Sequence, residues 1–162
     1  MSPTELDPMS LSLAELRAMR TDLQNDDDAV SYARRLVQVR IDMVAAEQRS
    51  RAQGTDIDDE LVAILGTQLS GGAPRPPRPA NDFSDHPHAV ELDQLCARFG
   101  ATDIGGLTDD ELSEFSELLV AFERARSAER RELFGRIDAL SAELVRRYRD
   151  GEASVDGLLA DD

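Results

Sequence analysis

The chain has 162 residues, a length that fits one domain or one domain with tails. Aromatic residues make up 4% of it and charged residues 31%, and it has no Trp, which suits long helices along a thin seam better than a thick core. The net charge of −15 argues against direct binding of duplex nucleic acid. No apolar run approaches the roughly 20 residues that span a bilayer.

The N-terminal residues are acidic and lack the apolar stretch of a signal peptide, so we expect a cytoplasmic protein. Residues 1–10 are predicted to be disordered. A long helix follows at 12–52, because Ser12 and Glu15 fit the capping box that satisfies the first free N–H groups, and Gly54 fits a C-terminal stop. The lone Cys96 excludes a disulfide framework.

The remaining elements are predicted from local signals such as apolar faces, capping residues, Pro and Gly. An apolar face predicts a short helix at 58–69, and repeated Pro and Gly predict a linker at 70–88 that cannot be helical. A second short helix is predicted at 89–99. A second long helix, at 108–149, opens with the capping box of Thr108 and Glu111 and stops near Gly151, and residues 150–162 form an acidic tail.

Both long helices carry an apolar stripe with a period of seven residues, which predicts a coiled-coil seam. The stripes consist of Leu16, Leu23, Val30, Val37 and Val44 in the first helix and Leu112, Leu119, Leu133 and Leu140 in the second. Ile41 and Ile137 lie beside them, and Arg126 interrupts the second stripe. Neither helix should be stable alone, so we expect them to pack on each other, in parallel or antiparallel.

The two long helices repeat one another at a constant spacing of 96 residues. Leu11-Ser12 and Glu15-Leu16 return as Leu107-Thr108 and Glu111-Leu112, and the same register relates Ser31, Arg34-Arg35, Arg40-Ile41-Asp42 and Ala46-Glu47 to Ser127, Arg130-Arg131, Arg136-Ile137-Asp138 and Ala142-Glu143. The repeat therefore covers polar positions as well as the seam.

At 100° per residue, the polar repeats form a stripe about 80° wide along the flank of each seam. The first stripe is Asp27, Ser31, Arg34, Gln38 and Asp42, and the second is Glu123, Ser127, Arg130, Phe134 and Asp138. Arg can fork onto guanine O6 and N7, stack on a base or contact phosphate, and a carboxylate can accept the N–H groups of guanine's Watson–Crick edge. The simpler alternative is a set of surface charge pairs beside a coiled coil.

The stripe spacing E-x3-S-x2-R-x3-Q-x3-D, present once per helix, resembles the signature of RsiG-type anti-sigma factors. The sequence from Leu11 to Asp42 also resembles that family's first helix. Arg136 to Tyr148, with the following Gly151 to Asp156, resembles its second helix and tail. The resemblance implies an all-α fold in which two long antiparallel helices form a coiled-coil hairpin. It also implies binding of two cyclic di-GMP molecules as an intercalated dimer, and sequestration of the sporulation sigma factor WhiG of filamentous actinobacteria by the loaded protein.

Two positions depart from that signature. Asp27 stands where the signature has Glu, and Phe134 stands where it has Gln. Phe134 could stack on a guanine or pack in the seam, and we favour packing. The ligand set implied by the resemblance is Asp27, Ser31, Arg34, Gln38, Asp42, Glu123, Ser127, Arg130 and Asp138, with Phe134 in doubt.

The resemblance predicts a regulator, and because both motif copies lie in one chain we expect a monomer. No metal is expected: His86-Pro87-His88 lacks a third ligand, and Asp26-Asp27-Asp28 lacks the Gly and Glu of a calcium loop. We see no phosphate loop or catalytic triad and expect no enzyme. One rival interpretation is a coiled-coil adaptor that binds a protein and no nucleotide. The other is a nucleotide-cleaving enzyme.

Overall fold

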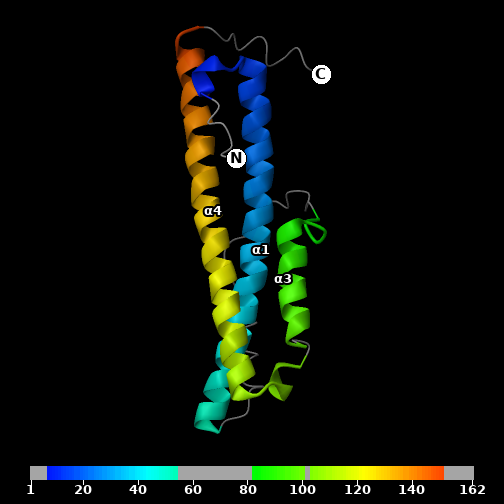
Figure 1. Cartoon of the computed structure of the whole chain (residues 1–162). Helices are drawn as coiled ribbons and strands as arrows, with labels where there is room; N and C mark the ends of the chain where they lie inside the picture. The colour runs from blue at the N-terminus through cyan, green and yellow to red at the C-terminus, as the bar shows by residue number, and fades with distance from the viewer. Residues whose placement is uncertain (1–6, 55–81, 101–102, 152–162) are drawn as a thin grey trace, which may run out of the picture. The chain divides into compact units, whose positions relative to one another are not determined.

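A computed structural model describes residues 7–54, 82–100 and 103–151. In this part of the chain the elements are all helical: η1 (Pro8–Ser10), α1 (Leu13–Gln53), α3 (Pro87–Arg98), η2 (Ile104–Gly106) and α4 (Asp109–Arg149), as Figure 1 shows. The all-α class and two long helices are thus confirmed. Helices α1 and α4 have 41 residues each and begin 96 residues apart, so the sequence repeat has the same helix bounds in both copies.

Both predicted capping boxes are present at the starts of the long helices. The backbone N–H of Ser12 donates to Glu15 Oε2 at 2.7 Å, and that of Glu15 donates to Ser12 Oγ at 3.2 Å. Thr108 and Glu111 repeat the pattern at 2.8 and 3.2 Å. Because the hydrogen bonds favour the charged carboxylate, the pKa values of Glu15 and Glu111 are lowered.

Glycines follow the C-terminal ends of the three described α-helices. Gly54, Gly100 and Gly151 have φ of 66°, 59° and 74°, the left-handed conformation that only glycine adopts without cost. The predicted stops at Gly54 and Gly151 are confirmed.

The chain divides into two compact units, and each long helix contributes to both. Among the described residues, the terminal unit comprises 7–28 and 128–151, and the central unit comprises 29–54, 82–100 and 103–127. In the terminal unit Arg17 contacts Tyr148 and Asp27 contacts Arg130, and in the central unit Arg34 contacts Glu123 and Arg51 contacts Asp109. Within each unit, α1 and α4 therefore run in opposite directions.

The predicted apolar stripes are buried. Every one of their nine residues is at most 7% exposed, from Leu16 and Val37 at 0% to Leu133 at 7%. This confirms the apolar faces of α1 and α4. That the two helices together form one coiled-coil hairpin stays a prediction.

In the central unit α3 adds a third layer to the core. Its buried residues Leu92 and Cys96 pack into a cluster of buried residues that includes Val37, Phe115 and Leu119. Phe99, just after α3, stacks on Phe115 with ring centroids 4.9 Å apart.

Arg126, which interrupts the apolar stripe, contacts residues of α3. Its guanidinium lies 5.2 Å from the Phe122 ring centroid and contacts Glu91 of α3 at 3.3 Å and His88. The polar residue in the seam therefore marks where a third helix joins the pair.

The two units use the same arginine contact at their ends. Arg51 donates to Glu47 at 2.6 Å and to the carbonyls of Ile104 and Gly105 in η2. Arg147, 96 residues later, donates to Glu143 at 2.7 Å and to the carbonyls of Pro8 and Met9, the equivalent positions in η1. We call each of these contacts an end clamp. The repeat thus extends upstream of Leu11, to the turns capped by Asp7 and Asp103.

Two predicted boundaries need correction. Pro8–Ser10 form η1 instead of belonging to a disordered tail, because Asp7 caps the turn and Arg147 binds its carbonyls. Helix α3 begins at Pro87, inside the predicted linker 70–88, because Pro is tolerated in a first turn and the His86 ring accepts from the His88 N–H at 3.3 Å.

The predicted helix 58–69, most of the linker and most of the tail at 150–162 lie outside the described residues. None of the described helices is long and apolar enough to cross a membrane.

Candidate functional site

In the central unit three residues of the two polar stripes form one cluster. Arg34 on α1 donates from Nε and Nη2 to Glu123 Oε1 on α4, at 3.3 and 3.1 Å. Ser127 Oγ, one turn further along α4, donates to the same oxygen at 2.7 Å. The Ser127 hydrogen bond, with the Arg34 contact, lowers the pKa of Glu123. Both members of the ion pair are 21% exposed, so the cluster is in reach of solvent.

In the terminal unit the equivalent cluster is looser. Arg130 on α4 donates from Nε to Asp27 Oδ1 on α1 at 3.2 Å, the single hydrogen bond between them. Asp27 is 16% exposed and Arg130 is 36% exposed. The Arg130 guanidinium also lies 4.7 Å from the centroid of the Phe134 ring.

These two ion pairs are reciprocal copies of one contact. Arg34 and Arg130 are equivalent in the repeat, and so are Asp27 and Glu123. In each pair the Arg of one helix contacts the acid of the other helix. In the sequence, each helix carries one complete copy of the motif, which suggests one site per helix. The structure instead builds each copy from both helices, because the helices run in opposite directions within each unit.

The other members of the stripes make few contacts. Ser31 and Asp42 are half-buried, whereas Gln38 and Asp138 are exposed. Among the described residues, no side chain forms a hydrogen bond or ion pair with Gln38, Asp42 or Asp138, and the Ser31 carbonyl accepts from Arg35 at 3.2 Å. These carboxylate and amide groups are therefore not engaged by the described part of the chain.

Phe134 does not pack in the seam, contrary to the favoured interpretation. It is 39% exposed, whereas the seam residue Leu133 beside it is 7% exposed. Its position is one residue past the seam on a helix that turns 100° per residue, so the ring points away from the core.

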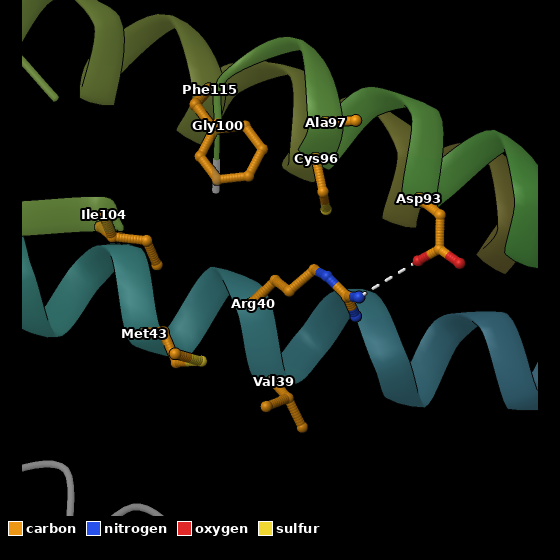
Figure 2. Close-up of a pocket in the computed structure, with 9 residues that line it drawn as sticks. All are labelled: Val39, Arg40, Met43, Asp93, Cys96, Ala97, Gly100, Ile104 and Phe115. Carbon is orange, nitrogen blue, oxygen red and sulfur yellow. Dashed lines mark hydrogen bonds and ion pairs between the residues drawn. The ribbon is translucent and has the colours of Figure 1, made fainter. Parts of the chain in front are cut away.

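A separate hollow of about 630 Å³ lies in the central unit (Figure 2). Its lining combines apolar groups such as Met43, Ile104 and Phe115 with the Arg40–Asp93 ion pair at 3.3 Å. Cys96 also lines it, and burial raises the pKa of this thiol. No stripe residue is among those that line this hollow.

The two histidines of the His86-Pro87-His88 sequence make contacts at the start of α3. His86 caps the helix and the His88 ring contacts Arg126. In the described ranges 7–54, 82–100 and 103–151, no three His, Cys, Asp or Glu residues gather in a way that could hold a metal ion.

The sequence model of the RsiG-like family matches residues 2–65 and 100–161, more than half of the chain. Each matched segment contains one long helix with its stripe, and neither includes α3. No curated protein matches the chain.

Proposed function

The chain belongs to the RsiG-like family, which suggests an anti-sigma factor role, and we propose that cyclic di-GMP controls this role. In the proposal, two long antiparallel helices form a coiled-coil hairpin and their two stripes bind a cyclic di-GMP dimer. The loaded protein then sequesters a WhiG-type sigma factor and represses late sporulation transcription. We further propose a cytoplasmic monomer with no metal, no catalytic activity and no direct contact with nucleic acid.

The reciprocal pairs Arg34–Glu123 and Arg130–Asp27 are the observation that carries the proposal. A ligand with two equivalent halves needs two equivalent sets of protein groups. Each unit supplies one such set. A cyclic di-GMP dimer has two such halves, each a molecule with guanines and phosphates that an Arg fork can bind.

Ligand binding would work by exchange of partners. Arg34 and Arg130 now donate to carboxylates that are partly exposed, and such pairs contribute little net stability. A phosphate or guanine can take over these donors at small cost. Asp42 and Asp138 can then accept from the Watson–Crick edge of guanine. The nucleotide would shift the population towards the form that the sigma factor recognises.

Calorimetric titration with cyclic di-GMP tests the nucleotide half of the proposal. Arg34→Ala and Arg130→Ala should each weaken binding at least tenfold, because a charge-assisted hydrogen bond contributes about 1.5–3 kcal/mol. The neighbours give matched controls: Arg35→Ala and Arg131→Ala remove the same charge from exposed positions outside the stripes and should bind as the parent does. No heat with the parent protein, shown to be folded by circular dichroism, would contradict the proposal.

Capture of a purified WhiG-type sigma factor tests the other half. The immobilised protein should retain the sigma factor with cyclic di-GMP present and release it when the nucleotide is removed. Arg34→Ala should lose this dependence, whereas Arg35→Ala should keep it. Equal retention with and without nucleotide would contradict control by the ligand.

The alternative is a nucleotide-independent adaptor that binds a protein partner only. One observation favours it: both stripe arginines already have acidic partners, so the stripes also make sense as contacts between helices. The adaptor predicts that Arg34→Ala and Arg130→Ala leave partner binding intact.

A further inference from the structure

Phe134 is the exposed member of the chain's five phenylalanines. Phe115 and Phe122 are 0% and 8% exposed and Phe83 and Phe99 are half-buried, whereas Phe134 is 39% exposed. Its equivalent in the repeat is Gln38, an exposed amide on α1. An aromatic ring has therefore replaced a hydrogen-bonding group within a polar stripe, at a position that the core does not need.

The ring of Phe134 already has one planar cation beside it. The Arg130 guanidinium lies 4.7 Å from the ring centroid and donates one hydrogen bond to Asp27 at 3.2 Å. Gly135, the next residue, lies in open space, because a Cβ added there would meet no atom within 4 Å. The terminal unit thus presents a ring and a guanidinium, both flat, beside an uncrowded helix surface.

We propose that Phe134 and Arg130 form a stacking platform for a guanine base of cyclic di-GMP in the terminal unit. This inference rests on the proposed function. Aromatic rings and guanidinium groups both stack on the face of a nucleobase. Phe134 would therefore contact the face of its base, whereas the Gln38 amide, at the equivalent position of the central unit, would contact an edge.

The chain offers a direct test because it contains no Trp. Phe134→Trp introduces one Trp, whose emission can be excited selectively over that of the two Tyr residues of the full chain. A stacked guanine should quench its emission saturably as cyclic di-GMP is added. Val145→Trp is the matched control, because Val145 lies on the same helix in the same unit, is 55% exposed and belongs to neither stripe. Its emission should not change.

Affinity measurements give the second readout. Phe134→Leu keeps the apolar character but loses the ring, and we expect about tenfold weaker binding, since stacking on an aromatic side chain is worth about 5- to 150-fold per base. Phe134→Tyr keeps the ring and should bind as the parent does. Circular dichroism of each variant establishes that it is folded.

The outcomes separate this inference from the proposed function. If the parent binds cyclic di-GMP but Phe134→Leu binds equally and Phe134→Trp is not quenched, the platform is wrong and the proposed function stands. If the parent does not bind the nucleotide, both are wrong. A Phe134→Trp signal that responds to the sigma factor alone would also overturn the platform, because Phe134 would then be an anchor for a protein partner.

Discussion

The central and terminal units contain equivalent ion pairs, yet the surroundings of these pairs differ. Glu123 accepts from Arg34 twice and from Ser127, whereas Asp27 accepts once from Arg130. The central unit also has α3 packed on its helix pair. In the terminal unit, the Arg130 guanidinium lies beside the exposed Phe134 ring. Two copies of one motif have thus become a tightly bonded cluster and an open one.

The largest expected effect tests what α3 contributes. Phe115→Ala should lower the free energy of unfolding by about 3–5 kcal/mol, because the ring is fully buried and stacked on Phe99. Its equivalent in the terminal unit is the half-buried Met19, and Met19→Ala should cost about 1 kcal/mol. Urea unfolding followed by circular dichroism measures both. Equal losses would contradict the difference between the two cores.

Acid should weaken the terminal end clamp. Hydrogen bonds from Arg146 and Arg147 lower the pKa of Glu143 to about 2. Because the folded pKa lies below the usual value of about 4.3, its contribution is present above that pH and lost as pH falls towards 2. Melting curves between pH 5 and pH 2 should show this loss, and Glu143→Gln should show less of it. Glu47→Gln, which removes a carboxylate with one arginine partner, is the control.

The ion pairs should differ modestly in strength. Glu123→Gln should cost about 1 kcal/mol of stability and Asp27→Asn about 0.5 kcal/mol, because Glu123 has more partners and both pairs are partly exposed. Thermal unfolding at low and high salt measures the difference, which should shrink at high salt. A larger loss for Asp27→Asn would reverse the ranking of the two clusters.

The smallest expected effect is a gain. Gly135→Ala should stabilise the protein by about 0.5 kcal/mol, because glycine within a helix is unfavourable and the added Cβ meets nothing. Val39 is the equivalent residue and borders the hollow of the central unit. A measured loss for Gly135→Ala would show that the helix surface beside Phe134 is not open.

The helices and their ends were predictable because their signals are local. Ser12, Thr108, Gly54 and Gly151 act within a turn of their own positions, and the seven-residue period fixes which face is buried. The predicted end of the linker was wrong because proline, which usually breaks helices, can also begin one, as Pro87 does.

The candidate site was predictable as a set of residues but not as a set of contacts. Helical angles place Arg34 and Glu123 on equivalent flanks, but they do not say which acid each Arg meets across the helix pair. That choice depends on direction and register, which are properties of the packed helices. The end clamps were missed for the same reason, although Asp7, Glu47 and Arg51 all recur at the spacing of 96 residues.

Carrying both copies of the repeat on one chain changes what a single mutation can do. In a symmetric pair of identical chains, every substitution appears at both sites at once. Here Phe134 alters one site while Gln38 remains in the other, and α3 packs in one unit without a counterpart among the described residues of the other. Covalent linkage thus frees the two halves of a symmetric receptor to specialise separately.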